Sequence, residues 1–194
     1  MQPEGLDPRV ARTRRDVVDA TAALLLERGW DGVTHAEVAQ RAGYSKATIY
    51  THWPNRVDLV GAAIDKICDS AEHPQPTGNL LEDLRISLRD FASDLTDGHL
   101  DRLLAGVIER AGTSDVFKTM RNRLYDAGTG TLRALLLEHM HPDEVEATLA
   151  LLTGAVLIRV SFEGTPATDA FIDEIIHRAL PGTARSNLPV EPFD

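Results

Sequence analysis

The sequence is short of cysteine and of long apolar runs, and each shortage excludes a class of protein. Its single cysteine, Cys68, cannot form an internal disulfide, which fits a reducing cytosol. No uninterrupted 18-residue apolar stretch is present, and the first residues lack the basic and apolar regions of a signal peptide. We therefore expect a cytoplasmic protein with no membrane-bound segment.

Aromatic residues and catalytic motifs are also scarce. Aromatics make up 5% of the 194 residues, period-two runs of β-branched residues are rare, and Ala and Leu are abundant, which predicts an all-α fold. No glycine-rich phosphate loop and no Ser-His-Asp spacing is found, so we expect no enzyme and no cofactor. His99, His139, His141 and Asp143 lack the spacing of metal ligands, and solvated helix ends explain them better than a metal site.

Basic residues are outnumbered, with 20 Lys and Arg against 30 Asp and Glu, for a net charge of −10. The imbalance is uneven, because residues 1–56 hold eight basic and seven acidic side chains while residues 57–194 hold twelve and twenty-three. Screening confines phosphate attraction to about 8 Å at physiological salt, so distant acid does not prevent residues 1–56 from binding DNA. The acid either weakens indiscriminate DNA binding or only confers solubility, and both can hold.

Residues 33–53 predict a helix-turn-helix. Thr34 and the glutamate three residues later form a capping box for a first helix, and Gly43 permits the turn that ends it. A second helix follows from Lys46 to about His52, with Ile49 as its buried anchor. The alternative is an ordinary helical hairpin.

The exposed side chains of this second helix favour DNA, since they all donate hydrogen bonds and none is acidic: Ser45, Lys46, Thr48, Tyr50, Thr51 and His52. Arg56 falls in the first turn of the next helix, where N–H groups and a cation can together hold a phosphate. Four arginines near the start, at positions 9, 12, 14 and 15, either contact phosphate or form a solvated helix end.

A Pro- and Gly-rich break at residues 73–78 divides the chain. We expect a DNA-binding domain over residues 7–56, a connector helix over 56–70 and a larger C-terminal helical domain over 71–182. Residues 183–194 are predicted to be a flexible tail. About nine helices are expected in all.

The last two predicted helices have nearly two apolar faces each, whereas a surface helix needs one. We interpret the extra face as the contact of a homodimer, which would let two recognition helices read a palindrome together. Deep burial in the core is the alternative. The predicted contact residues are Val145, Leu149, Leu152, Val156, Val160, Ile172 and Ile176, and a second stripe comprises Leu151, Ala155, Ile158 and Phe162.

The segment from Ala11 to Leu59 resembles the TetR (tetracycline-repressor-like) family of transcriptional regulators. The pattern that carries the resemblance is G-x-S-K-x-T-I-Y-x-H-[FW] at residues 43–53. It implies that Thr34, Tyr50 and His52 hold phosphates, and that Arg56 takes the place of a usual Lys. It also implies that Ser45, Lys46, Ala47 and Thr48 reach base edges or nearby backbone, with Thr51 at a variable specificity position. Ala47 and Trp53 depart from the usual Gly and Phe.

The resemblance further implies an all-α fold with an N-terminal three-helix bundle and a C-terminal domain for dimerisation and a small-molecule effector. Candidates for the effector pocket, which core packing explains equally well, are Phe91, Leu95, Leu103, Val107, Phe117, Met120, Leu124 and Tyr125. The function expected is a ligand-responsive repressor that binds a palindromic double-stranded DNA operator as a homodimer. The alternative is a helical ligand-binding or protein-interaction module whose helix-turn-helix is vestigial.

Overall fold

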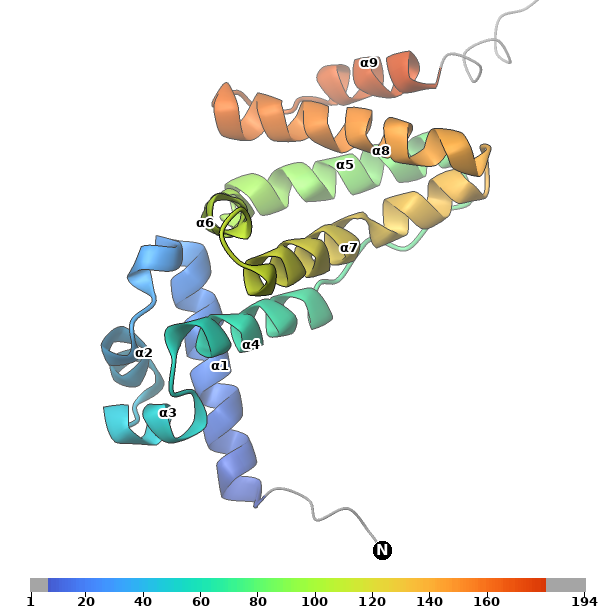
Figure 1. Ribbon diagram of the computed structural model, residues 1–194. Coiled ribbons are helices and arrows are strands. Elements are labelled where there is room, and N and C mark those ends of the chain that lie inside the picture. Colours follow the sequence, from blue (N-terminus) through green and yellow to red (C-terminus); the bar gives the residue numbers. More distant parts are fainter. Residues whose placement is uncertain (1–6, 181–194) are drawn as a thin grey trace, which may run out of the picture. The chain divides into compact units, whose positions relative to one another are not determined.

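The computed structural model describes residues 7–180, and over this range the regular elements are all helical, as predicted (Figure 1). The predicted tail at 183–194 lies outside the described residues. The elements in chain order are α1 (Pro8–Arg28), η1 (Trp30–Gly32), α2 (His35–Ala42), α3 (Lys46–His52), α4 (Arg56–Asp69), α5 (Leu80–Thr96), α6 (Leu100–Ala111), α7 (Asp115–Leu137), α8 (Pro142–Leu157), η2 (Ile158–Phe162) and α9 (Asp169–Ala179). η1 is a 3₁₀-helix, and η2 is a π-helical continuation of α8.

Side-chain caps fix where the helices of the N-terminal part begin. Thr34 accepts a hydrogen bond from the N–H of Glu37 at 3.1 Å, and Ser45 accepts one from the N–H of Thr48 at 3.1 Å. Gly43 has φ 75°, a left-handed conformation that costs other residues energy, and it ends α2 as predicted. The capping residues in the sequence therefore predicted the ends of α2 and the start of α3 correctly.

The chain forms two compact units, each built from two separate segments. Unit 1 comprises Met1–Ala71 and His99–Gly128, and unit 2 comprises Glu72–Gly98 and Thr129–Asp194, in both cases as far as these are described. The predicted boundary near residue 71 coincides with the first crossing between the units. The later return of the chain to unit 1, with α6 and the first part of α7, was not predicted.

The core of unit 1 explains this return. Leu103 and Val107 of α6 and Met120 and Leu124 of α7 are buried in the same cluster as Trp30. A Cβ added at Gly106 would lie 3.2 Å from the Cβ of Trp30, so the missing side chain allows α6 to approach η1 closely. The bundle that carries α2 and α3 is therefore completed by residues far along the sequence.

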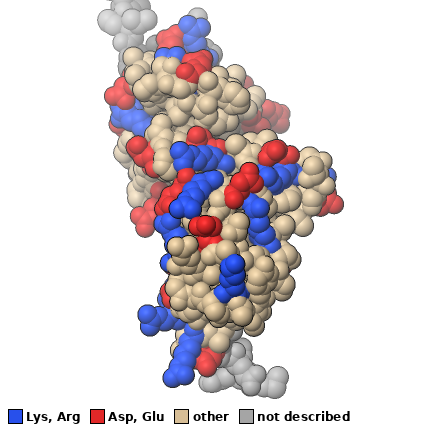
Figure 2. All heavy atoms as spheres, turned by 90° about the vertical axis from the view of Figure 1, so that its left-hand side faces the viewer, with Lys and Arg blue, Asp and Glu red and all other residues tan. Residues whose placement is uncertain are grey.

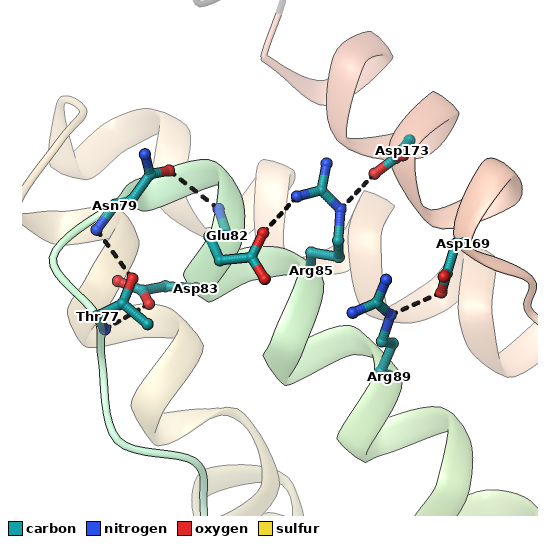
Figure 3. Close-up of polar contacts among 8 residues, drawn as sticks. All are labelled: Thr77, Asn79, Glu82, Asp83, Arg85, Arg89, Asp169 and Asp173. Atoms are coloured by element: carbon teal, nitrogen blue, oxygen red, sulfur yellow. Dashed lines mark hydrogen bonds and ion pairs between the residues drawn. The ribbon is translucent and has the colours of Figure 1, made fainter.

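Unit 2 packs α5 against α8 and α9. Its core combines Leu84 and Leu88 of α5, both 0% exposed, with the inner face of α8. Ion pairs join the exposed sides of α5 and α9, from Arg85 Nε to Asp173 at 2.7 Å and from Arg89 Nε to Asp169 at 2.6 Å (Figure 3). Two parallel pairs fix the relative register of these helices, although each exposed pair adds little stability.

The loop that leads into α5 is held by a buried carboxylate. Asp83 accepts a hydrogen bond from the backbone N–H of Thr77 at 2.6 Å (Figure 3). It accepts a second one from the backbone N–H of Gly78 at 3.1 Å. The bond from Thr77 is the main cause that lowers the pKa of Asp83. Asp83 therefore stays ionised, and its carboxylate holds the backbone of the loop that precedes α5.

One helix within residues 7–180, Pro142–Phe162, is long and apolar enough by length and composition to cross a membrane, with a mean hydropathy of 1.7. Core helices share these properties. Its inner face packs on α5 and α9, but only 28% of the apolar window is buried. The expectation of no membrane-spanning segment treated this run as interrupted, because Thr148, Thr153, Gly154 and Arg159 lie within it.

Replacing Leu103 by Ala should destabilise the helix-turn-helix bundle by about 2–4 kcal/mol, because it empties a fully enclosed site in the core of unit 1. Both tryptophans of the sequence, Trp30 and Trp53, lie in unit 1, so urea unfolding followed by tryptophan fluorescence reports on this unit. Ile108→Ala on the same helix is the control, since Ile108 is 54% exposed. Equal unfolding midpoints for the two variants would contradict a shared core.

Candidate nucleic-acid interface

The α2–α3 pair is anchored to the rest of unit 1 by the shared apolar core and by one hydrogen bond at the turn. Ile49 of α3 is 0% exposed and lies in the same core cluster as Val38 and Ala39 of α2. At the turn, the hydroxyl of Tyr44 donates a hydrogen bond to Asp16 Oδ2 of α1 at 2.8 Å. These contacts leave the opposite side of α3 exposed, as a recognition helix requires.

The predicted DNA-contact residues of α3 lie on this outer side, but several of their hydroxyl groups are already engaged. Thr51 Oγ1 donates to the backbone oxygen of Ala47 at 2.9 Å, and the hydroxyls of Ser45 and Thr48 are 2.8 Å apart. Among residues 7–180, no polar partner is found for the ammonium group of Lys46 or the hydroxyl of Tyr50. These two groups are therefore the most available donors on α3.

Tyr50 is held in place by a histidine that the sequence analysis did not single out. The rings of Tyr50 and His35 are stacked, with centroids 4.1 Å apart and planes at 3°. His35 Nε2 donates a hydrogen bond of 2.8 Å to the carbonyl oxygen of Trp53. The ring of Tyr50 is 50% exposed yet fixed in orientation, so its hydroxyl projects from a rigid platform. The only feature of the sequence that could have indicated this role is the position of His35 in the first turn of the predicted first helix.

His52 and the start of α1 meet at Trp53, which closes α3. The His52 ring lies against the Trp53 ring edge-on, with centroids 5.7 Å apart. The guanidinium of Arg14 lies 5.1 Å from the Trp53 ring centroid, a cation–π contact. Arg14 is thereby brought beside the recognition helix, and the substitution of Trp for the usual Phe provides its platform.

The side chain of Arg56, for which a phosphate contact was predicted, is engaged with η1 of unit 1. Its guanidinium lies 4.8 Å from the ring centroid of Trp30, donates to the backbone oxygen of Trp30, and is 3.7 Å from Asp31 Oδ1. Burial lowers the pKa of Arg56, and its Nε is buried without a partner. The sequence placed Arg56 correctly in the first turn of α4, but the large aromatic surface of Trp30 draws its side chain inward.

Most acidic side chains of the N-terminal segment are paired within unit 1, which a count of charges in the sequence does not reveal. Arg41 binds Glu27 through two hydrogen bonds of 2.6 and 2.5 Å, which lower the pKa of Glu27. Arg28 lies 3.2 Å from Glu37. Five acidic residues between positions 7 and 56 have a cationic partner within unit 1, namely Asp16, Asp19, Glu27, Asp31 and Glu37. The sixth, Asp7, accepts a hydrogen bond from the backbone N–H of Arg9.

The cations left over are those nearest α3. Arg9, Arg15 and Lys46 are exposed and have no acidic partner in the part of the chain that the structure describes, and Arg14 rests on Trp53. Figure 2 shows the corresponding face, where the part formed by α2 and α3 is mainly uncharged with a few Lys and Arg side chains. A nearly neutral segment therefore presents a locally positive surface, suited to phosphate.

The predicted effector residues are distributed over both units. Phe91 and Leu95 belong to unit 2, and Tyr125 is 44% exposed on α7. The other five are part of the core of unit 1 or pack on it: Leu103, Val107, Phe117, Met120 and Leu124. For these five, the structure shows core packing, the alternative given with the prediction, and the effector pocket stays a prediction.

A shallow cleft within unit 2 involves different residues. It is lined by Pro74, Gln75, Pro76, Asp83, Ile86, Ser87, Thr131 and Leu135. Its volume is about that of one water molecule, far below the roughly 300 Å³ of a small ligand pocket. It does not replace the predicted effector site.

The residues predicted for the homodimer contact lie mostly inside a single protomer. Six of the seven are buried, all at 4% exposure or less, and only Val160 is partly exposed. The exposed apolar side chains of the same region are instead Leu151, Ile158 and Phe162, at 63%, 47% and 77%. The structure therefore corrects the choice of stripe. The two stripes are equally apolar, so their pattern alone did not reveal which one faces α5.

Replacing Arg56 by Met should lower the free energy of unfolding by about 1–3 kcal/mol, because it removes a hydrogen bond and a cation–π contact at Trp30. The salt dependence of DNA binding should stay unchanged, since this guanidinium faces the core. Urea unfolding and binding titrations at several salt concentrations test both statements. Arg15→Met, at an exposed position, is the control for stability. An unaltered stability combined with a shallower salt dependence would show that Arg56 contacts phosphate.

Comparison with known proteins agrees with this geometry. Residues 17–63 match the model of the bacterial regulatory proteins of the tetR family, and residues 74–179 match the tetracyclin repressor-like C-terminal domain. The HTH-type transcriptional regulator YdeS of Bacillus subtilis is 27% identical over 195 residues, which cover 94% of this chain and 95% of YdeS.

Solved structures extend the match to the fold. The crystal structure of the TetR family transcription regulator SCO0332 is 31% identical, with a TM-score of 0.64, and the match covers 88% of this chain and 98% of that one. The multidrug binding protein EbrR, complexed with proflavin, has the same fold at 22% identity and a TM-score of 0.64, with 86% of this chain and 99% of that chain covered. The two family models, the full-length relative and the exposed recognition helix together show that this chain belongs to the tetR family of bacterial transcriptional regulators.

Proposed function

We propose that this DNA-binding regulator is a ligand-responsive repressor that binds a palindromic operator as a homodimer in the cytoplasm. The observation that carries the proposal is the α3 surface. There Lys46 and Tyr50 present donors that have no polar partner among residues 7–180, beside Arg9 and Arg15 of α1, which have no acidic partner in the same range. The acidic balance of the whole chain had favoured a vestigial helix-turn-helix. That argument loses weight, because the nearby acids are already paired.

On DNA, α3 enters the major groove, with Ala47 and Thr48 near base edges and Lys46 near a base edge or the neighbouring backbone phosphate. Tyr50 and His52 hold phosphates from fixed positions on His35 and Trp53. Thr34 contacts a phosphate from the exposed start of α2, and Ser45 does so from the start of α3. Arg14, held on Trp53, takes the phosphate-binding role that Arg56 does not fill.

The homodimer forms through the exposed apolar stripe of unit 2. Leu151, Ile158 and Phe162 are spaced seven and four residues apart, which places them on one side of the continuous α8–η2 helix. Large exposed apolar side chains in a row mark interaction sites on soluble proteins. A second copy is the expected occupant, because two recognition helices about one turn of DNA apart read a palindrome jointly.

A small-molecule effector would release the operator by changing the separation of the two recognition helices. A ligand shifts the population toward the state that it binds better, and a changed separation no longer fits both half-sites. Support for an effector comes from a protein with the same fold, EbrR, which was crystallised with proflavin and with ethidium.

Lys46→Ala should weaken binding to the operator and lower the slope of log affinity against log salt by about one, if its ammonium neutralises one phosphate. Lys118→Ala makes the same change in net charge on α7, where Lys118 lies 2.9 Å from Asp115, and should leave the slope unchanged. Fluorescence anisotropy with the upstream DNA of the gene, at four salt concentrations, measures both slopes. Identical slopes for the two variants would contradict the assigned role of Lys46.

Leu151→Glu should convert the homodimer into a monomer and raise the dimer dissociation constant at least about thirtyfold. In a two-fold symmetric interface the substitution occurs in both subunits, so two negative charges would be buried in the same contact. Ile108→Glu adds the same charge at another exposed apolar position and should leave the dimer intact. Sedimentation equilibrium gives the two dissociation constants. A dimer that persists in the Leu151 variant would place the interface elsewhere.

A further inference from the structure

The outer surface of α3 is less polar than its sequence indicates. Thr51 turns its hydroxyl toward the helix backbone and donates to the oxygen of Ala47 at 2.9 Å. The methyl group is the other substituent on the same Cβ, so it is the part of Thr51 that can touch an outside partner. Ala47 and Thr51 are both exposed and stand four residues apart, which makes them neighbours on one helix face.

Two methyl groups therefore stand together on a helix that otherwise offers an ammonium group and hydroxyls. In the major groove, thymine alone among the four bases presents a methyl group, at C5. Packing of this group against the methyls of Ala47 and Thr51 removes apolar surface from water on both sides. It also leaves no donor unsatisfied, because the Thr51 hydroxyl keeps its bond to Ala47.

The other bases fit this pair of methyls poorly. Guanine presents the acceptors O6 and N7, which a methyl group strips of water without supplying a donor. Cytosine N4 and adenine N6 each bring amino donors to the groove, and a methyl group facing such a donor strips its water without replacing the hydrogen bond. The usual Gly at position 47 would lack this group altogether. The departure from the family pattern at Ala47 thus adds an apolar surface as well as limiting close approach.

We propose that Ala47 and Thr51 are specificity-determining residues that read the 5-methyl group of thymine in each operator half-site. This inference rests on the proposed placement of α3 in the major groove. It identifies thymine as the base that faces the middle of the recognition helix. It also assigns the role of Thr51 to its methyl group and not to its hydroxyl.

The test begins with selection of binding sites from a pool of random DNA duplexes by the full-length protein. Each thymine of the enriched duplex is then replaced in turn by deoxyuridine, which lacks only the methyl group. At one or two positions per half-site, removal of the thymine methyl should weaken binding about fourfold.

Matched variants assign the effect to the two side chains. Thr51→Ser keeps the hydroxyl and removes the methyl, so it should abolish the difference between thymine and deoxyuridine at one position. Thr51→Val keeps the methyl and removes the hydroxyl, so it should retain the difference. Ala47→Gly should abolish the difference at its own position. Circular dichroism and tryptophan fluorescence of each variant verify that unit 1 is folded.

The outcomes separate the two proposals. An enriched site in which no deoxyuridine replacement weakens binding would overturn the thymine inference and leave the operator proposal standing. A deoxyuridine effect that survives in both Thr51→Ser and Ala47→Gly would also overturn it. If no sequence is enriched, both proposals fall, because a helix that reads no bases reads no methyl groups.

Discussion

The packing of Trp30 is the interaction on which the N-terminal bundle depends. Two guanidinium groups, from Arg56 and Arg110, each lie 4.8 Å from the centroid of its ring, and Phe117 meets it edge-on at 5.0 Å. Two cations beside one ring repel each other, and Asp31, 3.7 Å from each, offsets this repulsion. The cluster joins η1, the start of α4, α6 and α7, so the orientation of the helix-turn-helix depends on residues more than seventy positions downstream.

The sequence predicted what is encoded by neighbouring residues. Thr34, Gly43 and Ser45 determine helix ends through contacts within three or four positions, and these positions were predicted correctly. Arg56 was placed on the correct turn of the correct helix, but the direction of its side chain depends on Trp30, twenty-six residues earlier. Likewise, Leu103 and Val107 were named as residues of either a pocket or a core, but the sequence pattern did not identify the residues that they pack against.

Charge follows the same division between local and distant information. A count of side chains assigns residues 1–56 almost no net charge, which suggests weak attraction to DNA. The folded chain pairs Arg28 and Arg41 with glutamates. It leaves Lys46, Arg9 and Arg15 without acidic partners in the described part of unit 1. In unit 2, arginines of α5 pair with aspartates of α9, so basic groups there serve helix register. Cations without acidic partners thus favour DNA binding in unit 1, whereas paired charges align two helices in unit 2.

The return of residues 99–128 to unit 1 has a consequence for how such a protein can change over generations. The shortest segment that carries α2 and α3 is not a segment that folds, because Trp30 would be without the cover that α6 and α7 provide. Gene fusion or recombination near residue 71 would transfer a recognition helix without the part of its supporting core that α6 and α7 provide. A new operator preference is therefore reached more readily by point substitution at exposed positions of α3, such as Ala47 and Thr51, whose side chains support nothing else in the bundle.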